Sequence, residues 1–166
     1  MKDVQIYQQK LYSGGREKGK VAILWGGTTS DTPVDVMTRA VETYVGHDSY
    51  MEFVDKRLNQ PWLRVIIKGI NDIVFSVEQI ANHDVHLYEQ TLYDDNNEAK
   101  GKMAILISGI NSNKPTAILN QVVLQYTQGL QYNELVEKHL DNLWLRVIIT
   151  NINELKFANF INQRLS

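Results

Sequence analysis

Cysteine is absent from this sequence, and its absence removes several kinds of chemistry at once. A chain without thiols forms no disulfides, carries no thiolate nucleophile and builds no cysteine-based zinc site. The absence is also compatible with a reducing compartment.

Charge of one sign is also lacking, because 17 basic and 19 acidic residues give a net charge of −2. Sequence-independent affinity for nucleic acid comes mainly from clustered Lys and Arg, so this balance makes a nucleic-acid partner unlikely even if aromatic residues could stack on bases. No apolar run approaches the roughly 18 residues that a membrane span needs. The N-terminus Met1-Lys2-Asp3-Val4 lacks the apolar segment of a signal peptide, and we therefore expect a cytoplasmic protein.

Catalytic and metal-binding motifs are missing as well. The sequence has no Gly-x-Ser-x-Gly elbow and no His-Glu-x-x-His zinc motif, so we expect no enzyme activity, no catalytic residues and no cofactor. His83 and His86 stand three positions apart, but one pair without a further ligand predicts no metal site. The adjacent acids Asp94 and Asp95 are typical of a hairpin turn.

What the sequence does contain is a repeat. Trp62-Leu63-Arg64-Val65-Ile66-Ile67 returns as Trp144-Leu145-Arg146-Val147-Ile148-Ile149, 82 positions later. Lys18-Gly19-Lys20-Val21-Ala22-Ile23-Leu24 returns at the same spacing as Lys100-Gly101-Lys102-Met103-Ala104-Ile105-Leu106. Leu11-Tyr12 returns as Leu92-Tyr93 at a spacing of 81, so one residue was gained in the hairpin that follows. Three blocks in one order predict an internal duplication.

The duplication predicts two repeats, 1–82 and 83–166, that pack together as one globular unit with pseudo-two-fold symmetry. A lone unit of this size would bury only about 60–65% of its unfolded surface, which favours a shared core. An isologous two-fold contact is the commonest way for identical units to associate. The join Ala81-Asn82-His83-Asp84 is short and polar, which leaves little linker between the repeats.

The sequence of each repeat predicts the same series of strands and helices. We expect strands at 4–12 and 20–25, and then a helix that begins near Pro33 and buries Met37, Ala40, Val41 and Tyr44, with a matching helix that begins at Pro115. The capping pattern Ser49-Tyr50-Met51-Glu52 predicts a second, short helix that buries Tyr50, Phe53, Val54 and Leu58, matched by Tyr132, Leu135, Val136 and Leu140. Strands are expected at 62–68 and 73–79, and residues 155–165 form either a strand or a terminal helix.

These elements predict an α+β fold built from a duplicated ββααβ(β) unit, an antiparallel sheet with helices packed on one face. Leu63, Val65 and Ile67 are expected to lie under the helices, which leaves Trp62, Arg64 and Ile66 on the opposite face. A doubled strand–helix–strand unit resembles, in outline, the ligand-binding modules attached to some bacterial transcription regulators. That resemblance implies an effector-type domain that binds a small molecule.

The candidate binding residues come from positions that both repeats keep: Trp62, Arg64, Trp144, Arg146, Tyr7, Gln9, Tyr88 and Gln90. Trp and Arg two apart on a strand share a face, and aromatic residues with Arg are enriched in protein contact cores. We expect a non-catalytic protein that uses this face for contact with a protein partner or for self-association. Two alternatives stay open: the face is an internal seam between the repeats, or a groove between them binds a small ligand.

Two further segments could hold an anion, because each joins a strand to a helix N-terminus. They are Gly26-Gly27-Thr28-Thr29-Ser30 and Ser108-Gly109-Ile110-Asn111-Ser112. Neither has the Gly-Lys-Ser/Thr of a P-loop or the glycine spacing of a dinucleotide site. We interpret both as connecting loops.

Overall fold

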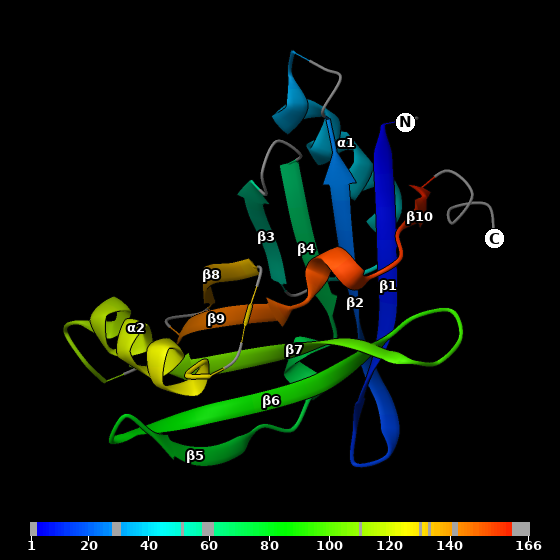
Figure 1. Cartoon of the computed structure of the whole chain (residues 1–166). Coiled ribbons are helices and arrows are strands. Elements are labelled where there is room, and N and C mark those ends of the chain that lie inside the picture. The colour runs from blue at the N-terminus through cyan, green and yellow to red at the C-terminus, as the bar shows by residue number, and fades with distance from the viewer. Residues whose placement is uncertain are drawn as a thin grey trace. The chain divides into compact units, whose positions relative to one another are not determined.

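The computed structural model describes residues 3–27, 31–50, 52–57, 62–109, 111–129, 131–132, 134–140 and 143–160. Within these residues the chain forms two antiparallel five-stranded sheets and two α-helices, so it is a mixed α+β protein with more strand than helix (Figure 1). Neither of these helices is long and apolar enough to span a membrane.

The chain divides into two compact units. Unit 1 contains Met1–Asp72 together with Lys156–Ser166, and unit 2 contains Ile73–Leu155. The units therefore differ from the predicted repeats at two segments, because 73–82 belongs to unit 2 and 156–166 to unit 1. That the repeats share one core stays a prediction.

Unit 1 is a sheet with one helix on it. Its strands lie in the order β10-β1-β2-β4-β3. Their bounds are Val4–Ser13 for β1, Arg16–Gly26 for β2, Glu52–Arg57 for β3, Trp62–Lys68 for β4 and Ala158–Asn159 for β10. Helix α1 spans Pro33–Val45, and the short 3-10 helix η1, Ile70–Asp72, follows β4.

Unit 2 has the strand order β5-β6-β7-β9-β8. The bounds are Ser76–Ile80 for β5, His83–Tyr93 for β6, Ala99–Ser108 for β7, Glu134–Leu140 for β8 and Leu143–Thr150 for β9. Helix α2 spans Pro115–Tyr126, and η2, Ile152–Glu154, follows β9.

One edge of each sheet is completed by a strand from the other predicted repeat. In unit 1, β10 pairs with β1 through Gln5↔Asn159 and Ile6↔Ala158. In unit 2, β5 pairs with β6, and His86 lies opposite Val77. The chain therefore enters unit 2 after Asp72 and returns to unit 1 after Leu155.

Each helix packs an apolar stripe on its own sheet. The core cluster under α1 in unit 1 consists of Val4, Ile6, Ala22, Leu24, Met37, Ala40, Val41, Val45, Ile66 and Phe160. The corresponding core of unit 2 consists of Val85, Ala104, Leu106, Val122, Val123 and Ile148. A proline in the first turn starts both helices, because its fixed φ suits a position that needs no N–H donor. The helices expected from Pro33 and Pro115 are thus confirmed.

The strands are confirmed at 4–12, 20–25, 62–68 and, with a shift at its start, 73–79. Of the ambiguous segment 155–165, Ala158–Asn159 is a strand, and 161–165 lies outside the described residues.

The prediction of a second, short helix in each repeat is wrong. Residues 52–57 form β3, which pairs with β4 through Val54↔Val65, and 134–140 form β8, with Val136 opposite Val147. Both segments lie beside the open edge of a neighbouring strand, and its unpaired N–H and C=O groups favour strand pairing over a marginal helix of a few residues. The repeat is therefore ββαββ with a further strand, rather than ββααβ. Leu58 and Met51 of the predicted helix lie outside the described residues.

Substitution of Phe160 tests how much the C-terminal segment contributes to the stability of unit 1. Its side chain is 1% exposed in the core under α1, and its ring centroid lies 6.2 Å from that of Tyr44. We expect Phe160→Ala to lower the free energy of unfolding by about 3–5 kcal/mol, because it leaves a cavity in a packed core. Urea unfolding followed by tryptophan fluorescence measures this change. Asn153→Ala, at an exposed position, is the control, and a loss below about 1 kcal/mol for Phe160→Ala would contradict the packing.

Candidate functional site

The Trp/Arg pairs lie on the face of the sheet that carries the helix. Trp62 and Ile66 of β4 both pack against the core cluster that includes α1. The expectation that Leu63, Val65 and Ile67 lie under the helix is therefore wrong. Both faces of β4 are rich in apolar residues, so its alternation could not decide which face the helix covers.

Both arginines are buried and bonded to their helices. Arg64 is 4% exposed, and its Nη2 donates to Thr38 Oγ1 of α1 at 2.9 Å. Arg146 is 6% exposed, and its Nη2 donates to Asn120 Oδ1 of α2. Arg146 Nε also lies 2.7 Å from Glu137 Oε1 of β8. Each guanidinium thus ties a helix to the sheet beneath it, which is a structural role for a residue with five N–H donors.

Tyr7 and Gln9 do not share the Trp/Arg face. The register pairs Tyr7 with Ile23 and Ile23 with Val65, whereas Arg64 lies opposite Leu24. Neighbouring positions on a strand point to opposite faces, so Tyr7 and Arg64 lie on opposite faces of the sheet. The same parity separates Tyr88 and Gln90 from Trp144 and Arg146. The single Trp/Arg/Tyr/Gln face expected from the sequence is therefore not assembled.

The two tyrosines instead make matching local contacts. Tyr7 Oη donates to Gln9 Oε1 at 3.3 Å, and Tyr88 Oη donates to Gln90 Oε1 at 3.2 Å. The ring of Tyr7 lies 6.1 Å from that of Phe157, and Tyr88 lies 6.1 Å from Phe75. Each phenylalanine precedes the strand that completes the sheet, so the tyrosines help to hold that strand in place.

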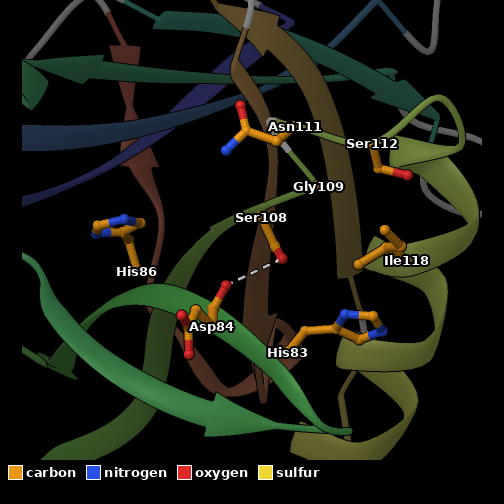
Figure 2. A pocket seen from close by; sticks show the side chains of 8 residues that line it. All are labelled: His83, Asp84, His86, Ser108, Gly109, Asn111, Ser112 and Ile118. Atoms are coloured by element: carbon orange, nitrogen blue, oxygen red, sulfur yellow. Dashed lines mark hydrogen bonds between the residues drawn. The ribbon is translucent and has the colours of Figure 1, made fainter.

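A cavity of about 340 Å³ lies in unit 2 (Figure 2). It is lined by His83, Asp84, His86, Ser108, Gly109, Asn111, Ser112 and Ile118. These residues come from the start of β6, the end of β7, the following loop and the first turn of α2. The second of the two loops considered for anion binding therefore borders a cavity. In the first loop, residues 28–30 lie outside the described residues.

A difference of one residue accompanies the opening between β6 and β7. In unit 1 the ladder of β1 and β2 extends to Val4↔Gly26, and a Cβ placed on Gly26 would lie 2.1 Å from the carbonyl oxygen of Asp3. The sequence of unit 2 has Ser108 at the position of Gly26. There the ladder stops one pair earlier, at His86↔Ile107. We infer that the Ser108 side chain keeps the start of β6 away from β7, because Gly26 permits the closer approach in unit 1.

Hydrogen bonds fix the wall of this cavity. Ser108 Oγ donates to the carbonyl oxygen of Asp84 at 3.3 Å, as the dashed line in Figure 2 marks. Ser112 Oγ accepts the Lys114 N–H at 2.9 Å, and the Ser112 N–H donates to Gly109 O at 3.2 Å. Gly109 has φ +74°, and a Cβ there would meet Pro115 at 2.8 Å, so only glycine fits this turn.

The lining combines polar side chains with apolar surface. It offers the imidazoles of His83 and His86, the carboxylate of Asp84 and the amide of Asn111, with Ile118 as an apolar contact. Figure 2 shows the two imidazoles far apart, with Asp84 between them in this view. Positions three apart on a strand point to opposite faces, which explains the separation. In the described part of the chain, no group of three or more His, Asp or Glu side chains could hold a metal ion.

Comparisons with protein-family models, with curated proteins and with solved structures find no match to this chain.

The sequence did not predict this cavity, because the candidate residues were chosen from positions at which both repeats have the same residue. The signal was a difference between them: Gly26 in one repeat and Ser108 in the other, with Lys2 in place of His83. Whether such a difference opens a gap depends on how closely two strands approach, which the sequence does not state.

Gly26→Ser tests the proposed cause of the opening. We expect the variant to be destabilised by about 1–3 kcal/mol, because the new side chain collides with the Asp3 carbonyl or parts β1 from β2. The measurement is the urea midpoint, with Lys18→Ser on an exposed part of the same strand as control. A Gly26→Ser protein as stable as that control would show that the close approach is not required.

Proposed function

We propose that this protein binds a small polar molecule, without catalysis, in the cavity of unit 2. The observation that carries the proposal is the cavity between β6, β7 and the start of α2, which is lined by several side chains that can form hydrogen bonds. Its volume is at the small end of the range for ligand sites in proteins, and its wall is fixed by hydrogen bonds between loop and strand. Such a cavity fits a compact ligand with both hydrogen-bond donors and acceptors.

The site differs in place from the groove expected between the repeats. All of its lining residues lie within 83–118, inside one repeat. We therefore keep the proposal of a small ligand but place its site inside the second repeat. Binding here needs no catalytic residue and no cofactor. The ligand-binding modules of bacterial regulators remain a resemblance in outline.

Protein contact through the Trp/Arg residues is the weaker proposal. A contact surface needs exposed side chains at its centre, and truncation is costly where those side chains fill a partner's pockets. Arg64 and Arg146 are 4% and 6% exposed and already bonded to Thr38 and Asn120. One Nη2 donor of each guanidinium is thus engaged within its own unit, and the buried side chain is not available at a surface.

The proposal also includes an origin for the two units. We infer an ancestral duplication, followed by specialisation of the second repeat as the ligand site. Support comes from the strand registers: Gln5↔Asn159 in unit 1 and His86↔Val77 in unit 2 pair residues that correspond at spacings of 81 and 82. Pseudo-two-fold symmetry would follow from such an exchange, since each repeat gives its last strand to the other's sheet.

A library of small polar molecules, screened by ligand-observed NMR, tests the binding proposal. We expect ligands that raise the melting temperature as their concentration rises. Ser108→Gly should weaken their binding about tenfold or more, which is about 1.4 kcal/mol, because β6 can then close on β7. His83→Ala should weaken binding by removing a lining group.

Thr91→Ala is the matched control, because Thr91 lies on β6 but does not line the cavity. The proposal fails if no library member binds, or if Ser108→Gly and the control bind the ligands equally well.

A further inference from the structure

Three lysines lie in a row across the sheet of unit 1. Lys10 of β1 is the partner of Lys20 of β2, and Lys20 is the partner of Lys68 of β4. Direct partners on antiparallel strands have Cβ atoms about 4.5–5.5 Å apart and point to the same side. Like charges in such positions are destabilising, and Lys20 has one on each side.

The two outer lysines have acidic partners. Lys68 Nζ lies 3.0 Å from Asp48 Oδ2, and Lys10 Nζ lies 3.7 Å from Glu17 Oε1. Within the described residues Lys20 forms no such ion pair. Its Nζ lies 5.7 Å from the ring centroid of Tyr44, and Lys68 Nζ lies 4.8 Å from the same ring.

Tyr44 provides no negative charge for Lys20 at neutral pH. Its hydroxyl donates to Gln8 Oε1 at 2.6 Å. Burial, and then the charge of Asp48, raises the pKa of Tyr44 to about 12, so the phenol stays protonated.

These surroundings favour the neutral amine of Lys20. Burial is the main cause that lowers the pKa of Lys20, followed by the charge of Lys68 and, more weakly, that of Lys10. Asp48 and Glu17 act in the opposite direction without cancelling the shift. The neutral form of a lysine is its nucleophilic form.

Unit 2 contains a lysine, Lys102, with which Lys20 can be compared. Lys102 corresponds to Lys20, and its Nζ lies 5.8 Å from the ring centroid of Tyr126, which corresponds to Tyr44. Its strand partners, however, are Thr91 and Thr150 in place of Lys10 and Lys68. Lys102 Nζ also lies 2.7 Å from Glu89 Oε1. Both amines are half-buried, so they differ mainly in the charges around them.

We propose that Lys20 is a site of covalent acylation, modified in preference to Lys102 by small acyl donors such as acyl phosphates. The neutral Nζ attacks the carbonyl carbon of the donor, and a C–N bond forms as the C–O bond to phosphate breaks. Phosphate leaves with the bonding electron pair, and the surplus proton on Nζ passes to water. The product is a neutral amide, so the row loses its central charge. This site is independent of the cavity in unit 2.

Acetyl phosphate is the probe. The full chain is incubated with it at low extent of reaction between pH 7 and pH 9, and acetylation at each lysine is quantified by mass spectrometry. We expect Lys20 to react several-fold faster than Lys102 near neutral pH.

Two double variants exchange the neighbours of the two lysines. Lys10→Thr with Lys68→Thr gives Lys20 the neighbours of Lys102, and its rate should fall toward that of Lys102. Thr91→Lys with Thr150→Lys does the reverse, and the rate of Lys102 should rise. Circular dichroism confirms folding, and if the first variant unfolds, the second decides the matter. The proposal is overturned if Lys20 reacts no faster than Lys102, or if the folded variants leave both rates unchanged.

Discussion

The structure depends on one constraint, which is that each sheet takes one edge strand from the other predicted repeat. Strand β10 arrives from the C-terminal end to pair with β1, and β5 leaves the first repeat to pair with β6. The ladder in unit 1 is short, but Phe157 and Phe160 accompany it and pack against Tyr7, Trp25 and Tyr44. Side-chain burial, rather than the two ladder pairs, therefore supplies most of the attachment.

The buried arginines orient each helix on its sheet. Apolar packing is non-directional, so the stripe of α1 could slide over the sheet at little cost. A guanidinium that rises from β4 to Thr38, or from β9 to Asn120, fixes one point of that contact. The Glu137 carboxylate at 2.7 Å offsets part of the desolvation cost of Arg146. This explains why both repeats keep Arg two positions after Trp.

Single residues that differ between the two repeats give the two units different local environments. Ser108 in place of Gly26 changes the end of one ladder and accompanies a cavity, whereas lysines in place of Thr91 and Thr150 create a row of like charges in unit 1. One framework thus supports two distinct local environments, because the strand ladders and helix contacts set the backbone while the substituted side chains change the local chemistry.

The sequence by itself determined the strands with strong alternation and the helices that begin at Pro33 and Pro115. These features follow from local geometry and periodicity, which a single segment contains. Only the tertiary structure decided that 52–57 and 134–140 are strands, that Trp62 and Arg64 lie under a helix, and that Tyr7 lies on the opposite face. Each of these depends on which strand edge lies alongside and in which register, and a shift of one residue reverses every side chain. The cavity beside Ser108 is of the same kind, since a distance between two backbones creates it.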